Sequence, residues 1–177
     1  MKKVLIISSS PRKGGNSDTL CDEFMHGAEE VGHEVEKVFL KDKKINYCTG
    51  CGACAKTHKC AQKDDMAELL VKLGEADVIV LASPIYFYTV CGQMKVFIDR
   101  CCSGYNRIAD KDFYYILTAA DPMPDAIDRA VSDFQGFLDC LDNPQEKGTL
   151  CGVGLWGRGD VKSSEYMEGA YKMGRSV

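Results

Sequence analysis

Two loops of the sequence stand out for the chemistry of their residues, the first rich in hydroxyl groups and glycines and the second in aromatic rings. The first, residues 8–17, is a run of serines and glycines with Arg12, placed between an apolar run and a helical pattern. Backbone N–H groups and the positive end of a helix dipole attract anions at such a junction. The hydroxyls of Ser9, Ser10 and Ser17 can donate to phosphate oxygens, and Arg12 can offer a two-pronged charged contact.

This loop lacks the G-K-[ST] ending of a P-loop and the G-x-G-x-x-G pattern of dinucleotide-binding folds. An ordinary polar turn between strand and helix is the alternative. The second loop, residues 83–90, places the rings of Tyr86, Phe87 and Tyr88 in a row. Such rings often only cover a sheet edge. A phosphate anchor facing a planar apolar slot instead predicts a mononucleotide with a large ring, such as FMN.

A third stretch holds four cysteines with the spacing Cys48-x2-Cys51-x2-Cys54-x5-Cys60. Three thiolates spaced by two residues and a fourth nearby are typical of ferredoxin-like iron–sulfur sites. Structural zinc usually takes two separated pairs, and Cys-x-x-Cys spacing also permits a reversible disulfide without metal. The spacing leaves these three alternatives open. His58 in this stretch is interpreted as a solvated loop residue, and the six other cysteines mostly as buried small apolar residues.

Alternating apolar runs and helical patterns position these loops. The runs at residues 4–7 and 78–82 have no polar face, as in strands buried on both sides of a parallel sheet. Asp65 and Glu68 predict a capping box for the helix that follows them. Strands are expected at residues 4–7, 35–40, 78–82, 113–118 and 150–153, and helices near 20–31, 66–73, 94–101, 124–141 and 164–173.

This alternation predicts an α/β fold with a doubly wound five-stranded parallel sheet of order 2-1-3-4-5 and helices on both faces. Ligands of such sheets bind beyond the carboxyl ends of the strands, where the strand order reverses. Here that point lies between the first and third strands, so the serine loop and the aromatic loop should face each other. The cysteine loop, which follows the second strand, is expected on the same rim.

Composition narrows the class of protein. The chain has 177 residues, 45% apolar content and a net charge of −4, which predicts a single domain over residues 1–177 with a cysteine-rich loop at 41–63. The charge argues against nucleic acid or an anionic membrane as a partner. With no signal peptide evident at the N-terminus and ten cysteines, the protein is expected to be cytoplasmic.

Four segments together resemble the NADPH-dependent FMN reductase family of flavodoxin-like proteins, and especially its iron–sulfur flavoprotein branch. They are SSPRKGGNS (9–17), CTGCGACAKTHKC (48–60), KDDM (63–66) and SPIYFYTVCGQMKVFIDR (83–100). Beyond Arg100 the resemblance lies mainly in the layout of strands and helices. Ser9 is a departure, because the family commonly has glycine at this position.

The resemblance implies roles for individual residues. Ser10, Arg12, Asn16 and Ser17 would hold the FMN phosphate, with the role of Ser9 less defined. Along the isoalloxazine ring would lie Pro84, Ile85, Tyr86 and Phe87, with Tyr88, Thr89 and Gly92 close by. In the iron–sulfur branch the four-cysteine spacing holds a 4Fe–4S cluster, which implies Cys48, Cys51, Cys54 and Cys60 as ligands.

The expected function is that of an FMN-dependent oxidoreductase passing electrons from NAD(P)H or a reduced protein to a quinone, flavin, azo or nitro compound. The alternative is an iron–sulfur flavoprotein that transfers electrons without small-molecule turnover. No catalytic side chain is assigned, since the flavin carries the redox chemistry. A homodimer or homotetramer is expected, because the aromatic loop leaves apolar surface that a partner subunit would cover.

Overall fold

The computed structural model describes residues 1–177 and contains one mixed sheet. Five parallel strands follow the order β2-β1-β3-β5-β6, and the short strand β4 pairs antiparallel with the end of β3. Without β4, this is the predicted order 2-1-3-4-5, so the predicted fold class is confirmed. The bounds are β1 (Lys3–Ser8), β2 (Glu34–Phe39), β3 (Val78–Tyr86), β4 (Thr89–Val90), β5 (Asp112–Thr118) and β6 (Gln145–Gly152).

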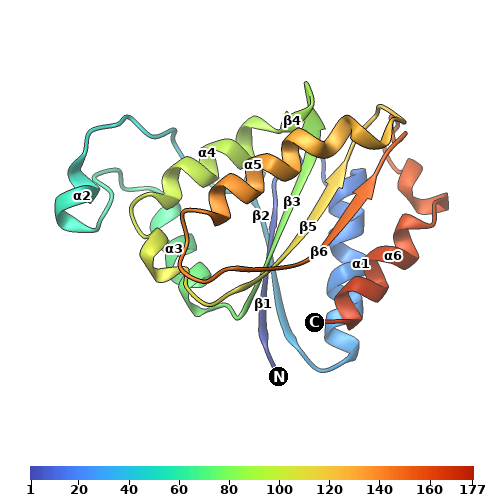
Figure 1. Cartoon of the computed structure of the whole chain (residues 1–177), viewed down its shortest axis with the longest axis horizontal. Coiled ribbons are helices and arrows are strands. Elements are labelled where there is room, and N and C mark those ends of the chain that lie inside the picture. The colour runs from blue at the N-terminus through green and yellow to red at the C-terminus, as the bar shows by residue number, and fades with distance from the viewer.

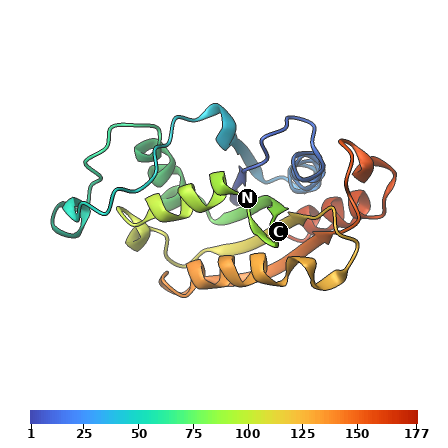
Figure 2. The same ribbon diagram turned by 90° about the horizontal axis from the view of Figure 1, so that it is seen from above.

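Helices cover both faces of the sheet, as predicted (Figures 1 and 2). One face carries α1 (Asn16–Glu30) and α6 (Tyr166–Arg175), which enclose an apolar core with Ile6 and Phe24. The other carries α3 (Met66–Glu75), α4 (Gly92–Cys101) and α5 (Asp128–Leu138), around Phe97 and Phe134. The short helix α2 (Ala53–Thr57) stands apart from the sheet in the cysteine-rich loop (Figure 1). None of the helices combines the length and apolar character needed to cross a bilayer.

Helices α1 and α6 pack with their backbones in contact at two glycines. A Cβ atom on Gly27 would lie 2.2 Å from the carbonyl oxygen of Tyr171, and one on Gly174 would lie 2.0 Å from that of Phe24. Real Cβ atoms do not approach backbone this closely, so only glycine fits at these positions. This contact fixes the last helix, and with it the preceding loop, against the start of the chain.

Three local features differ from the sequence-based expectations. Strand β6 begins at Gln145 and not near residue 150, because an edge strand paired on one side tolerates polar residues that hide the pattern. Strand β3 continues into a hairpin with β4. The predicted capping box of Asp65 and Glu68 is wrong, because the Asp65 side chain makes no cap hydrogen bond to α3. The Asp65 carboxylate instead accepts the N–H of Lys44 (2.6 Å), and Asp64 accepts the N–H of Met66 (3.3 Å).

Candidate functional site

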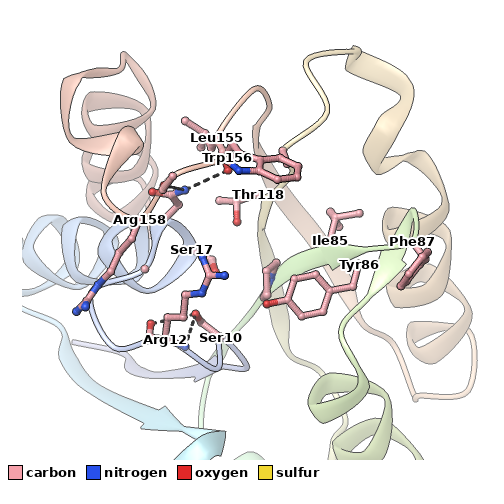
Figure 3. Close-up of a pocket in the computed structure, with 15 residues that line it drawn as sticks. Ser10, Arg12, Ser17, Ile85, Tyr86, Phe87, Thr118, Leu155, Trp156 and Arg158 are labelled. Atoms are coloured by element: carbon pink, nitrogen blue, oxygen red, sulfur yellow. Dashed lines mark hydrogen bonds between the residues drawn. The ribbon is translucent and has the colours of Figure 1, made fainter.

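A cavity of about 710 Å³ opens at the carboxyl edge of the sheet. Four segments build its wall: the loop after β1 with the start of α1, the end of β3 with its turn, the end of β5 with the loop after it, and the loop after β6 (Figure 3). Its volume falls within the range of small-molecule and cofactor sites. The residues that line it are Ser10, Arg12, Gly15, Asn16, Ser17, Pro84, Ile85, Tyr86, Phe87, Thr118, Ala120, Leu155, Trp156, Gly157 and Arg158.

The loop after β1 turns tightly into the first turn of α1. The Ser10 hydroxyl donates to the carbonyl oxygen of Arg12 (3.1 Å) and accepts the Arg12 N–H (3.2 Å). Gly15, the residue before the helix, makes no side-chain cap, and a Cβ atom there would lie 2.9 Å from the Arg12 carbonyl oxygen. The first N–H groups of a helix have no intrahelical partner. Here they border the cavity without a capping side chain.

Two side chains that face the cavity have no partner within the chain. The Arg12 guanidinium makes no hydrogen bond or ion pair, and it points into the cavity beside Ser17 (Figure 3). Ser17 is buried, and its hydroxyl also lacks a hydrogen-bonding partner. An uncapped helix N-terminus with a free guanidinium and a free hydroxyl has the donors that a phosphate group requires.

The side chain of Asp18 stabilises the conformation of the loop after β1. The buried Asp18 carboxylate accepts the Gly14 N–H at 2.8 Å and the Lys37 ammonium at 2.8 Å. Lys37 also pairs with Asp22. Burial opposes the charge on Lys37, but its hydrogen bonds to Asp18 and Asp22 raise the pKa of Lys37 overall. The Lys37 ammonium therefore neutralises the charge of the Asp18 carboxylate, which lies near the anion-binding loop.

The hairpin β3–β4 forms the opposite wall. Phe87 and Tyr88 lie at its turn with φ angles of 52° and 63°, which residues other than glycine rarely adopt. The Tyr86 ring extends toward the cavity, whereas the Phe87 ring points away from it and is 98% exposed (Figure 3). The Tyr88 hydroxyl donates to Asp121 (2.9 Å), which raises the pKa of Tyr88.

Eight of the twelve predicted cofactor residues line the cavity, and four do not. Ser9 is buried behind it, where its hydroxyl donates to the Ala82 carbonyl oxygen (2.8 Å) and the Cys91 thiol lies 3.1 Å away. The Thr89 hydroxyl bonds the carboxylate of Asp133. The eight that line the cavity are Ser10, Arg12, Asn16, Ser17, Pro84, Ile85, Tyr86 and Phe87, and the four that do not are Ser9, Tyr88, Thr89 and Gly92.

Asn16 lines the cavity, but its side chain is fully engaged elsewhere. Its Nδ2 donates to the carbonyl oxygens of Leu155 (3.2 Å) and Gly157 (2.9 Å). Its Oδ1 accepts the N–H groups of Gly159 (3.0 Å) and Val161 (3.3 Å). An asparagine amide has two donor hydrogens and two acceptor lone pairs, so no capacity remains for a ligand. Asn16 connects the start of α1 to the loop after β6.

Sequence reasoning missed the loops after β5 and β6. The end of β5 and the loop after it contribute Thr118 and Ala120, and the loop after β6 contributes residues 155–158, which include Trp156 and Arg158. Arg158 turns from the cavity and donates to the carbonyl oxygens of Lys13 and Gly14. No motif marks these segments. The available signal was topological, since every loop at the carboxyl edge beside the strand-order reversal borders the same crevice.

The four thiols of the cysteine loop do not form a ligand set in this structure. No group of three or more His, Cys, Asp or Glu side chains has an arrangement that holds a metal ion. Cys48 and Cys51 are exposed, and Cys54 and Cys60 are half-buried. A further cysteine follows the end of α4, where desolvation and the neighbouring Cys54 raise the pKa of Cys102. Of the six other cysteines, Cys21, Cys91 and Cys101 are buried as expected and Cys151 is half-buried, whereas Cys102 and Cys140 are exposed.

Arg100 in the last turn of α4 clamps both ends of this loop. Its guanidinium donates to the carbonyl oxygen of Asn46 (2.6 Å), to both carboxylate oxygens of Asp64 (2.7 and 2.9 Å) and to the Cys60 thiol (3.4 Å). The loop therefore docks at the end of α4, whereas the cavity borders the hairpin before the first turn of that helix. None of residues 41–63 lines the cavity, although Asp42 at the start of this loop pairs with Lys13 of the serine loop (2.6 Å).

Comparison with known proteins agrees with this picture. A profile of the family described as NADPH-dependent FMN reductase matches residues 2–139. An iron–sulfur flavoprotein of Archaeoglobus fulgidus is 50% identical over 98 residues, which cover 55% of this chain and 44% of the relative. One of Methanocaldococcus jannaschii is 45% identical over 98 residues, covering 55% and 51%. The chain thus spans about half the length of these curated relatives.

Among solved structures, an azoreductase from Bacillus anthracis superposes over the full length of both chains with a TM-score of 0.76 and 17% identity, a likeness of fold. The sheet and its edge cavity define a flavodoxin-like α/β protein. The chain belongs to the NADPH-dependent FMN reductase family. The resemblance inferred from its motifs, to this family and to the iron–sulfur flavoproteins, is confirmed.

Proposed function

We propose that the chain binds FMN in the edge cavity and acts as an FMN-dependent oxidoreductase. The observation that carries this proposal is the pairing, within one cavity, of an anion-binding end with an apolar aromatic wall. The uncapped start of α1 forms the first, and Pro84, Ile85 and Tyr86 form the second. Membership of the family and the similarity to proteins named flavoproteins and azoreductases support it.

Different residues of the cavity would contact the phosphate and the ring of the cofactor. Arg12 and Ser17 donate to the phosphate together with the backbone N–H groups of the first turn of α1. No carboxylate lines the cavity, so nothing there repels a dianion. Asn16 contributes through its backbone and through the loop that its side chain holds. Tyr86 and the neighbouring apolar side chains exclude water from the planar ring.

The bound flavin would supply hydride and single-electron chemistry. The protein would give an electron donor and an acceptor access to the flavin, because the cavity opens at an exposed edge of the sheet. We propose NAD(P)H or a reduced protein as the electron donor and a quinone, flavin, azo or nitro compound as the acceptor. The Phe87 ring points away from the cavity, and Tyr88 does not line it. Both rings are exposed, and a partner subunit that covers them would form a homodimer or homotetramer.

Binding measurements test this proposal. Wild-type protein stripped of flavin should bind FMN in preference to FAD, because the loop suits a terminal monophosphate. Arg12→Ala should weaken FMN by about 1.5–3 kcal/mol, the value of a charged hydrogen bond. Arg175→Ala, at the far end of α6, serves as the control and should leave FMN affinity unchanged. No flavin binding, or equal affinity in wild type and Arg12→Ala, would contradict the assigned site, and steady-state NAD(P)H oxidation tests the reductase activity.

The second candidate function is electron transfer through an iron–sulfur cluster without small-molecule turnover. The spacing of the four cysteines and the similarity to iron–sulfur flavoproteins favour it. The thiols as arranged do not form a ligand set, and cluster binding requires the four sulfurs to converge on one point. Iron and acid-labile sulfide assays on anaerobically prepared protein distinguish the candidates. Near-zero iron after reconstitution leaves the flavin reductase alone.

A further inference from the structure

The ring of Trp156 is exposed at a place where nothing in the chain explains its exposure. Trp156 is the single tryptophan of the protein, it is 83% exposed, and it lines the edge cavity. Figure 3 shows its ring on the loop after β6, across the cavity from Arg12 and Tyr86. It lies beyond residues 2–139 that the family profile matches. An exposed aromatic ring of this size on a cavity wall is suited to contact a ligand.

The backbone on both sides of Trp156 is held firmly. The Asn16 amide bonds the carbonyl oxygens of its two neighbours, Leu155 and Gly157. The Leu155 N–H donates to the carbonyl oxygen of Ala119 (2.9 Å), and the Leu155 side chain packs against the core beneath α6. The loop is thus anchored to α1, to the segment after β5 and to the core. The exposed ring stands on an ordered base, which reduces the conformational cost of binding.

The position of Trp156 in the cavity indicates the part of a ligand that it meets. The donors for an anion gather around Arg12 and Ser17 at the start of α1, whereas Trp156 adds a second aromatic wall to that of Tyr86. The indole offers a wide apolar face and no negative charge. Aromatic side chains favour stacked or edge-on contact with other planar rings.

We infer that Trp156 is a binding residue for the planar ring of the cofactor, and that residues 155–158 form one wall of the flavin site. This inference rests on the proposed function, because the ring in question is the isoalloxazine of FMN. Affinity for the ring then depends on a segment that folds against Asn16.

Ligands that lack the phosphate separate ring contacts from phosphate contacts. Lumiflavin, which carries the ring without ribityl phosphate, and FMN are titrated into flavin-free wild type, Trp156→Ala, Trp156→Phe and Arg12→Ala, with binding followed by flavin fluorescence. Trp156→Ala should weaken both ligands by about tenfold, and Trp156→Phe should recover most of the loss. Arg12→Ala should weaken FMN alone. Tyr47→Ala, at a 72% exposed ring outside the cavity, is the matched control and should change neither.

Each other outcome overturns the inference. Unchanged lumiflavin and FMN affinity in Trp156→Ala would show that the indole does not touch the ring. If that variant instead alters sedimentation with flavin affinity intact, Trp156 contacts another copy of the chain. Loss of FMN binding without loss of lumiflavin binding would place Trp156 at the phosphate. Failure of wild type to bind either ligand would defeat the proposed function itself, which the other outcomes leave standing.

Discussion

Replacing Asp64 by asparagine removes the charge that neutralises Arg100 inside the protein. Both side chains are 1% exposed, and the guanidinium nitrogens lie 2.7 and 2.9 Å from the carboxylate oxygens. Removing one partner of a buried ion pair costs about 3–5 kcal/mol, because the other charge stays buried without compensation. Asparagine preserves the shape and one acceptor oxygen. We therefore expect Asp64→Asn to lower the free energy of unfolding by about 3 kcal/mol at pH 7.

The pH dependence of this cost follows from the pKa of Asp64. Its hydrogen bonds to Arg100 lower that pKa from 3.8 to about 2. A carboxyl group with a lowered pKa stabilises the folded state above its unfolded pKa, and this contribution is lost as the pH falls through the folded pKa. The two values correspond to about 2.5 kcal/mol at neutral pH, of which about 1 kcal/mol disappears between pH 5 and pH 3. The rest of the cost comes from the unpaired Arg100.

Urea unfolding at pH 5 and pH 3 measures both quantities. The difference between wild type and Asp64→Asn should shrink by about 1 kcal/mol at the lower pH. Asp99→Asn is the matched control on the same helix, since the Lys95–Asp99 pair is exposed and should contribute less than about 0.5 kcal/mol. Trypsin should also cut at Lys56 or Lys59 faster in Asp64→Asn. A cost equal to that of the control, or independent of pH, would refute an ionised buried carboxylate.

Three further changes test other parts of the structure. Asn16→Ala removes four hydrogen bonds to the loop after β6 and should lower the free energy of unfolding by about 2 kcal/mol in urea, whereas a loss below about 0.5 kcal/mol would mean that the loop is held without it. Sedimentation at micromolar concentration should show a dimer or tetramer, and Phe87→Ser should weaken that assembly; a strictly monomeric wild type would contradict the expected subunit contact. If the cysteine loop binds a cluster, substitution by alanine of any one of its four thiols should reduce the iron content of anaerobic protein while FMN stays bound, and equal iron in all variants would exclude those ligands: Cys48, Cys51, Cys54 and Cys60.

The sequence predicts the centre of this fold better than its edges. The runs at residues 4–7 and 78–82 are apolar throughout because β1 and β3 are covered on both faces, and this pattern is visible locally. Strand β6 pairs on one side only and starts with polar residues, so its beginning was missed. The same contrast between local and long-range signals holds for the residues that line the cavity. Its β1 and β3 loops carry recognisable residue types, whereas the link between Asn16 and Gly157 joins positions 141 residues apart that no local pattern relates.

The same link sets the order in which the cavity is completed during synthesis. Asn16 leaves the ribosome before its partners, which follow 139 to 145 residues later. At about 5–20 residues per second, roughly 7 to 30 seconds separate the two ends of this contact. Throughout that interval the serine loop is present without the loop after β6, which lines the same cavity. Completion of the cavity is therefore a late step in the synthesis of the chain, and a nascent chain that stops before the loop after β6 has an incomplete cavity.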